Sequence, residues 1–184
     1  MRLTATETVA TLVNAPPLDA FERLIAAHEP RVRRLAYRLL GWQGGRDEID
    51  DVVQDVFLAA YKRSETFRGE SDVSTWLASV TINRCRTYQR RQVLRLKWFR
   101  RQHVENEALG SDEKSLRDEA GERVRTAIDA LRAKDREVIV LFYLEALPIA
   151  EIASMLSVTN NAIEVRLHRA RQRLKELLGD LMNE

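Results

Sequence analysis

The sequence predicts an all-α fold of two small helical domains, the second containing a helix-turn-helix, joined by a flexible acidic linker. Three observations support this fold class. The 184 residues include only 7 Gly and 4 Pro, and aromatic residues make up 7%, so residues that build sheets and tight turns are scarce. Apolar residues recur at helical spacing through most of the chain. The charges also fall into separate blocks along the sequence.

The composition excludes several classes of protein. The single cysteine, Cys85, leaves no partner for an intrachain disulfide, which suits a reducing compartment. No apolar run approaches the roughly 20 residues that a membrane-spanning helix requires. Residues 1–17 lack the basic start and continuous apolar core of a secretion signal, and we interpret them as a disordered leader. We therefore expect a cytoplasmic protein without membrane insertion.

Two neighbouring blocks carry opposite charge. Residues 84–101 contain eight Lys and Arg and no acidic residue, a density that attracts polyanions. Residues 102–122 contain seven acidic and two basic residues, two glycines and no regular apolar stripe, which predicts a linker. The chain therefore divides into one domain at 18–101 and a second at 123–184.

In the first domain, helical spacing predicts a helix at 18–40, broken or kinked at Pro30, and an amphipathic helix at 46–62. The polar face of the second helix carries four residues at i, i+3, i+4 and i+7 spacing, namely Asp51, Gln54, Asp55 and Leu58.

This face has three interpretations. The first is a solvated acidic surface, and the second is a docking face for a basic partner. The third is a metal site, because Asp50, Asp51 and Asp55 resemble the aspartate-rich motif of prenyl-transferring enzymes. A metal site of that kind needs a second acidic helix across a deep cavity. The sequence has no second aspartate-rich segment, so we predict no metal.

A third helix begins near 73–76, where Ser71 or Ser74 is the predicted cap. Its first half is apolar nearly all round and is expected to be buried. Its second half places Arg84, Tyr88, Arg91 and Arg95 on one face. An aromatic ring among arginines suits nucleic acid, because the ring stacks on a base while the guanidinium groups bind phosphates. The alternative is a charged helix end that only keeps the protein soluble.

In the second domain, apolar residues predict a helix around 124–131 and another after Asp135, the expected N-cap. Pro148 opens a short helix, Thr159 is the expected cap after the turn, and a last helix runs over about 160–178. The last two helices fit a helix-turn-helix. The outward side of the final helix presents Asn161, Val165, His168, Arg169 and Gln172, flanked by Glu164 and Arg166. The alternative is a bundle helix with a solvated basic face.

No catalytic constellation is present in the sequence. The three histidines, His28, His103 and His168, belong to different segments, and there is no glycine-rich phosphate loop and no CxxC motif. Cys85 lies in a mostly apolar helix and is interpreted as a core residue. We therefore expect neither enzymatic activity nor a cofactor.

Three stretches carry a resemblance to a known family. They are DEIDDVVQDVFLAAY (47–61), FRGESDVSTWLASVTINRCRTYQRR (67–91) and LPIAEIASMLSVTNNAIEVRLHRARQRLKELL (147–178). In content, order and separation they resemble the extracytoplasmic-function (ECF) group of bacterial RNA polymerase sigma factors. The resemblance implies a protein that binds core RNA polymerase, directs promoter-specific transcription initiation, and recognises and melts promoter DNA.

The resemblance also implies roles for individual residues. The clamp of the polymerase β′ subunit would contact Asp51, Gln54, Asp55 and Leu58. The loop at 67–72, with Phe67 and Arg68, would hold a flipped base of the minus-ten element, and the nearby strand would meet Asn83, Arg84, Tyr88 and Arg91. The minus-thirty-five element would lie against Asn160, Asn161, Glu164, Val165, Arg166 and His168. We add Arg169 to this set because it lies on the same outward side of the last helix. An anti-sigma factor is an expected partner.

The sequence departs from the family pattern at the start of the last helix. The family commonly has a Gly-Thr-Val-Lys-Ser-Arg-Leu run there, whereas this chain has Asn-Ala-Ile-Glu-Val-Arg-Leu at 161–167. Glu164 replaces a cation and Val165 replaces a hydroxyl, which predicts an unusual minus-thirty-five preference. The competing hypothesis is a stand-alone helix-turn-helix regulator with a non-sigma N-terminal domain, which would bind duplex DNA without polymerase.

Overall fold

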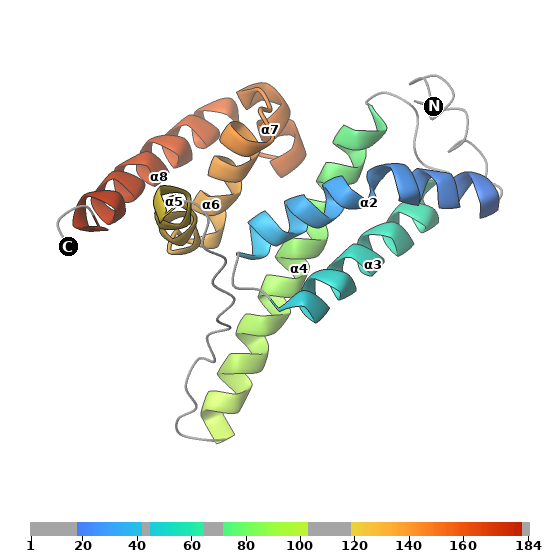
Figure 1. The fold of residues 1–184 in the computed structure, drawn as a ribbon, viewed down its shortest axis with the longest axis horizontal. Coiled ribbons are helices and arrows are strands. Elements are labelled where there is room, and N and C mark those ends of the chain that lie inside the picture. Colours follow the sequence, from blue (N-terminus) through green and yellow to red (C-terminus); the bar gives the residue numbers. More distant parts are fainter. Residues whose placement is uncertain (1–17, 42–44, 65–71, 103–118, 182–184) are drawn as a thin grey trace. The chain divides into compact units, whose positions relative to one another are not determined.

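The computed structural model describes residues 18–41, 45–64, 72–102 and 119–181, and the secondary structure in these ranges is helical (Figure 1). Contacts between α-carbons divide the chain into two compact units. The first contains most of α2 (Leu18–Leu40) with α3 (Arg46–Arg63) and α4 (Val73–Gln102). The second contains the helices α5 to α8. Among the described helices, none combines the length and the apolar character needed to cross a bilayer.

Helix α2 has the bounds that the apolar periodicity predicts, but Pro30 does not end it. The helix continues through the proline, and buried residues lie on both sides of it, among them Leu24, Val32 and Leu35. The lost backbone hydrogen bond at Pro30 is offset by this burial, since each buried leucine or valine side chain contributes about 1.5–3 kcal/mol.

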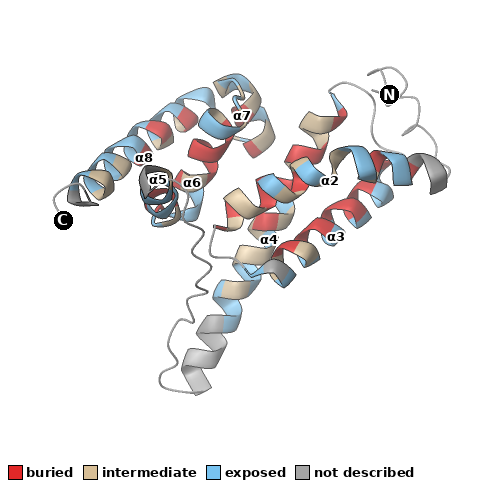
Figure 2. Ribbon diagram, viewed as in Figure 1, coloured by how far each residue is buried: buried red, intermediate tan, exposed pale blue. Residues whose placement is uncertain are grey.

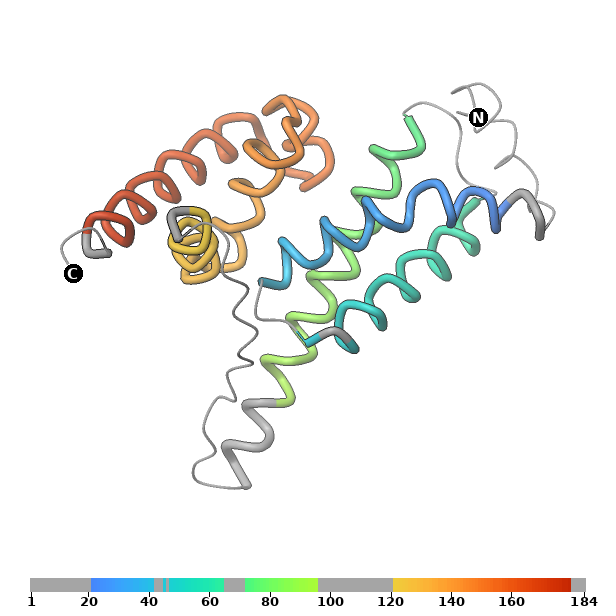
Figure 3. Tube along the Cα trace, in the orientation of Figure 1, coloured from blue at the N-terminus to red at the C-terminus, as the bar shows by residue number. Residues whose placement is uncertain are grey.

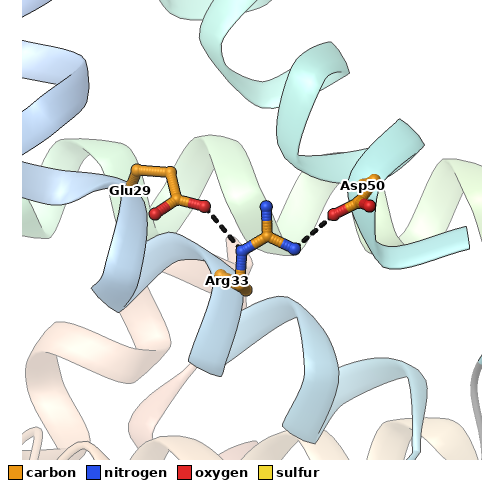
Figure 4. Close-up of polar contacts among 3 residues, drawn as sticks. All are labelled: Glu29, Arg33 and Asp50. Atoms are coloured by element: carbon orange, nitrogen blue, oxygen red, sulfur yellow. Dashed lines mark hydrogen bonds and ion pairs between the residues drawn. The ribbon is translucent and has the colours of Figure 1, made fainter. Parts of the chain in front are cut away.

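Helix α3 is amphipathic, as predicted. Its apolar face is buried and includes Ile49, Val52, Val53, Val56 and Phe57 (Figure 2). Arg33 of α2 donates to Glu29 within its own helix and to Asp50 at the start of α3 (Figure 4). The three side chains are only partly buried, so these contacts contribute less to stability than to the orientation of α3 against α2.

Helix α4 begins after Asp72, whose carboxylate accepts hydrogen bonds from the backbone N–H and the hydroxyl of Ser74 at 3.3 and 2.9 Å. Asp72 is therefore the cap, not Ser74, because a carboxylate one residue before the helix accepts the free N–H of the first turn. The first half of α4 is largely buried, as expected, and Cys85 is a core residue at 2% exposure. α3 and α4 pack side by side.

The second unit is built from α5 (Glu119–Asp129), α6 (Ala133–Ile139), η2 (Val140–Leu144), α7 (Ile149–Leu156) and α8 (Asn160–Leu181), whose paths Figure 3 traces. α5 begins inside the range 102–122 that the sequence assigned to a linker. Residues 103–118, like the leader at 1–17, lie outside the described residues. The core is formed by large branched aliphatic side chains such as Ile139, Leu141, Ile152, Ile163 and Leu167.

The expected N-cap role of Asp135 is wrong. Arg132 precedes α6, and Asp135 lies within the first turn, where it is 5% exposed. The helix starts earlier than predicted because the carbonyl of Arg132 accepts from the N–H groups of Asp135 and Arg136, at 2.8 and 2.9 Å. The carboxylate of Asp135 instead forms an ion pair with Arg169 of α8. Arg136 of α6 instead donates to the last carbonyls of the preceding segment, those of Asp129 at 2.7 Å and Leu131 at 3.3 Å.

Among the described residues, two that are not glycine have a left-handed backbone, Ala146 after η2 and Ser157 after α7, each with φ of 54°. Ser157 lies in the turn of the helix-turn-helix, where the N–H of Val158 bonds to the carbonyl of Ala153 at 3.0 Å. Thr159 caps α8 as predicted, because its hydroxyl oxygen accepts from the N–H of Ala162 at 3.2 Å. The left-handed turn lets α7 and α8 approach while their apolar faces pack together.

We expect Ser157→Gly and Ala146→Gly each to stabilise the second unit. A left-handed non-glycine residue costs about 1–2 kcal/mol, and the extra freedom of unfolded glycine offsets about 0.5–1 kcal/mol, so the expected gain is roughly 0.5 kcal/mol. Hydrogen exchange of the α6 and α8 amides measures it. Ser154→Gly, in the middle of α7, is the matched control and should destabilise the unit. Equal effects at residues 154 and 157 would contradict the account.

Candidate nucleic-acid and protein interfaces

The polar face of α3 is exposed from Asp51 to Leu58. Asp51, Gln54, Asp55 and Leu58 all reach solvent, and Leu58 keeps 59% of its surface exposed. The buried residues Val52, Val56 and Ala59 fix this face, because they direct the opposite side of the helix into the core. An exposed leucine one turn after two carboxylates fits a partner surface that is basic and carries an apolar contact.

A groove of about 360 Å³ runs between α3 and α4. One wall carries Asp51, Gln54, Asp55 and Leu58, and the other carries Tyr88, Arg91, Gln92 and Arg95. The sequence assigned the first set to a protein partner and most of the second to nucleic acid, as two separate surfaces. The structure brings both sets to a single groove.

Tyr88 is held in this groove by a short polar chain. The Gln92 amide donates to the Tyr88 hydroxyl at 2.5 Å and lies 3.5 Å from the carboxylate of Glu48 in the first turn of α3. Partial burial raises the pKa of Tyr88, and the hydrogen bond and negative charge of Glu48 add to the rise, while Gln92 and Arg95 oppose it. Tyr88 therefore stays neutral at physiological pH, with one edge of its ring fixed by Gln92.

The other predicted residues of α4 have different surroundings. Asn83 is exposed, and its backbone carbonyl accepts from the Thr87 hydroxyl at 2.9 Å. Arg84 is half-buried and Arg91 is exposed. Phe67 and Arg68 lie in the segment 65–71, outside the described residues.

Helix α8 presents its predicted outward residues to solvent. Asn160, Asn161, Glu164, Val165 and His168 are exposed, and Arg166 is half-buried. Val165 keeps 56% of its surface exposed. The inner face of the same helix is buried through Ile163, Leu167 and Ala170, so the exposed residues form the side that is available to a groove of duplex DNA.

Arg169 has a structural contact that the sequence did not reveal. Its guanidinium group binds Asp135 of α6 through two hydrogen bonds, Nη2 to Oδ1 at 2.5 Å and Nε to Oδ2 at 3.3 Å. Asp135 is buried, whereas the Arg169 side chain remains 57% exposed. The two residues are 34 positions apart, and no local pattern in the sequence pairs them.

A second arginine of α8 is also positioned by distant residues. The Nε of Arg171 donates to the Tyr143 hydroxyl at 2.8 Å, and the guanidinium group lies 5.8 and 5.6 Å from the ring centres of Phe142 and Tyr143. Both aromatic residues belong to η2, a π-helical turn that nothing in the sequence pattern predicted. Within the described residues, no three His, Cys, Asp or Glu side chains come together as metal ligands would.

Comparison with known families gives two matches along the chain. Residues 24–95 match the profile of Sigma-70 region 2, and residues 121–174 match that of Sigma-70, region 4. The first range contains the groove between α3 and α4, and the second contains the helix-turn-helix.

Curated relatives match over nearly the whole chain. The ECF RNA polymerase sigma factor SigM of Mycobacterium tuberculosis is 32% identical, with 88% of this chain and 79% of the relative covered. The ECF RNA polymerase sigma factor SigW of Bacillus subtilis is 27% identical, with 89% and 91% covered.

Two solved structures resemble the chain in fold. The sigma factor RpoE of Bartonella quintana, in complex with the anti-sigma factor NepR, has a TM-score of 0.70 at 23% identity, with 88% of this chain and 98% of that chain covered. CnrH, in complex with the cytosolic domain of CnrY, has a TM-score of 0.63 at 27% identity, with 96% and 95% covered.

We expect Arg169→Gln to destabilise the second unit by about 1–2 kcal/mol, because it leaves the buried Asp135 without its charged partner while solvent still reaches the outer side of the pair. Arg166→Gln, three residues earlier on α8, is the control and should change stability by less than about 0.5 kcal/mol. Hydrogen exchange of the α6 and α8 amides measures both. Equal stability of the two variants would show that the Asp135 pair contributes nothing.

Proposed function

Because the chain belongs to the extracytoplasmic-function (ECF) sigma factors and directs transcription, we propose that it does so through the three surfaces described above. The exposed face of α3 binds core RNA polymerase, the second half of α4 binds the opened minus-ten element, and α8 reads the minus-thirty-five element. The observation that carries the proposal is the exposed set on α3, with Leu58 at 59% exposure one turn after Asp55. A free-standing helix-turn-helix regulator would need no such face.

For the polymerase, the occupant that fits α3 is a basic helix of the clamp in the β′ subunit. Asp51 and Asp55 supply charge complementarity and Leu58 supplies the apolar contact. Charged groups of this kind speed association and set orientation, while a desolvated apolar anchor supplies affinity. The polymerase core catalyses RNA synthesis, and this chain provides promoter specificity. We accordingly expect the protein to act in the cytoplasm, where core polymerase and the chromosome are found.

For the minus-ten element, Tyr88 and Arg91 fit a single strand. A neutral, positioned ring stacks on a base, which contributes about 1–3 kcal/mol per base, and Arg91 neutralises a phosphate. Asn83 and Arg84 lie earlier on the same helix, toward the loop that contains Phe67 and Arg68. We propose that this loop holds a flipped base at the upstream edge of the melted region.

For the minus-thirty-five element, the exposed residues near the start of α8 meet base edges in the major groove. Glu164 accepts a hydrogen bond from a cytosine amino group, and Val165 contacts a thymine methyl group. Asn160, Asn161 and His168 flank them, and Arg166 reaches phosphate. Arg169 contributes positive charge near the phosphates while its inner edge holds Asp135.

An anti-sigma factor is the further partner that we propose. CnrH, which is 27% identical to this chain, is seen in complex with the cytosolic domain of CnrY. The exposed α3 and α8 faces are the surfaces that such a protein would cover, because covering either one blocks polymerase or DNA.

Mixing the purified chain with sigma-free bacterial core polymerase tests the proposal. We expect a stable complex on gel filtration and promoter-dependent transcription. Asp55→Lys should weaken the complex at least about tenfold, because it places a cation against a basic partner. Glu22→Lys, the same charge reversal on α2 away from this face, should leave it intact. A folded chain that forms no complex would overturn the proposal.

Selection from a random promoter library with core enzyme tests the role of α8. Glu164→Lys should change the preferred base at one or two minus-thirty-five positions, with discrimination of about 1–3 kcal/mol per base pair altered. Glu176→Lys makes the same charge change on the same helix about three turns later and should leave the preference as it is. If both variants select the wild-type sequence, Glu164 does not read DNA.

A further inference from the structure

Two adjacent aromatic residues of η2, Phe142 and Tyr143, hold one arginine of α8 in a fixed direction. Their rings meet edge to face, with 4.9 Å between the ring centres and 85° between the ring planes. The guanidinium group of Arg171 lies 5.8 and 5.6 Å from the two ring centres, and its Nε donates to the Tyr143 hydroxyl at 2.8 Å. An arginine that is held by two rings and a hydrogen bond has lost much of its rotamer freedom.

The charge of Arg171 is not neutralised by this arrangement. The other two arginines in this part of α8 each bind a carboxylate, Arg169 that of Asp135 and Arg173 that of Glu176 at 2.9 Å. Arg171 is held by neutral groups instead, and within the part of the chain that the structure describes the Tyr143 hydroxyl is its one hydrogen-bond partner. Its two Nη groups therefore remain available to an anion.

Arg171 lies at one edge of the outward side of α8. It follows Glu164 by seven residues, which is about two helical turns, so both lie on the same side of the helix. It also directly follows Ala170, which is fully buried, so its side chain leaves the helix at the border of the core. Arg169 lies about 160° away around the helix axis, at the opposite edge. A helix in the major groove has one phosphate backbone along each edge.

The contact with η2 has a small effect on stability. Arg171 is exposed and Tyr143 keeps 53% of its surface exposed, and contacts between exposed side chains contribute little to the free energy of unfolding. The main consequence of the contact is the direction of the guanidinium group. An arginine with a fixed direction loses less conformational freedom when it binds a phosphate, which raises affinity.

We propose that Arg171 binds a DNA phosphate at this edge of α8, and that Tyr143 and Phe142 are positioning residues that orient it before DNA binds. The inference rests on the proposed function, because it takes duplex DNA to lie against the outward side of α8. Phosphate contacts set the register of a helix in the groove without reading sequence. The π-helical turn then strengthens DNA binding without touching DNA.

The salt dependence of binding tests the phosphate contact. The full-length chain is assembled with core polymerase and bound to a duplex that carries the minus-thirty-five element and ends upstream of the minus-ten element. Between about 50 and 200 mM salt, Arg171→Gln should reduce the slope of log affinity against log salt by about 0.9 and weaken binding about fivefold at the lower salt. Arg173→Gln removes the same charge from α8 and is the control. Because Glu176 already neutralises Arg173, this variant should change the slope by less than about half as much. A wild-type slope in Arg171→Gln would overturn the proposal.

A double-mutant cycle tests the positioning role of Tyr143. Tyr143→Phe keeps the ring and removes the hydroxyl, so it should weaken binding about two- to threefold without changing the slope, because the phosphate contact still forms. In the Arg171→Gln background it should have no effect. An effect of equal size in both backgrounds would indicate a merely structural role and would overturn the proposal, as would unchanged binding of the single variant.

Hydrogen exchange at the side chain of Arg171 tests the same claim in the free chain by NMR. Its Nε–H should exchange with water more slowly than that of Arg125, an exposed arginine of α5, and Tyr143→Phe should abolish the difference. Equal exchange rates in the wild type would contradict a fixed direction. Failure of the chain to bind core would contradict the proposed function alone. The same variants are then compared as free full-length chains on the same duplex in about 50 mM salt, where phosphate contacts dominate.

Discussion

The packing of α3 against α4 decides which side chains of the first unit reach a partner. Both helices bury one apolar face, α3 through residues such as Val53 and Val56 and α4 through Leu77 and Ile82. Once these faces are buried, the opposite side of α3 has to be exposed, and the later turns of α4 have to lie alongside it. The exposed face of α3, the exposed later turns of α4 and the groove between them all follow from this one contact between helices.

The second unit depends on a comparable constraint over a longer range. Asp135 on α6 binds Arg169 on α8, and the aromatic residues of η2 lie against Arg171 on the same helix. These contacts fix the middle of α8, at Arg169 and Arg171, and the turn at Ser157 fixes its N-terminal end. The proposed contacts of α8 with base edges require a fixed orientation of the helix, because hydrogen bonds to bases tolerate little displacement. Two of its arginines therefore support the helix as well as supplying positive charge.

Charge has different consequences in the sequence and in the folded unit. Along the chain, the acidic residues of α3 and the basic block at 84–101 are separate features, and each suggests its own partner. In the folded unit, residues of both sets, among them Asp51, Asp55, Arg91 and Arg95, line a single groove between α3 and α4. Two features that are separate along the chain therefore belong to one surface of the folded unit.

The sequence by itself determined most of the helices, the division into two units and the family, because apolar periodicity and motif order are local properties. It also identified the exposed residues of α3 and α8, since the polar side of an amphipathic helix is defined by its apolar side. Only the tertiary structure decided that Asp72 caps α4, that Asp135 pairs with Arg169 and that Tyr88 shares a groove with Asp51. Those outcomes depend on the distance between residues on different helices, or on competition among neighbouring caps. The packing of helices sets such distances, and they cannot be derived from the spacing of residues along one helix.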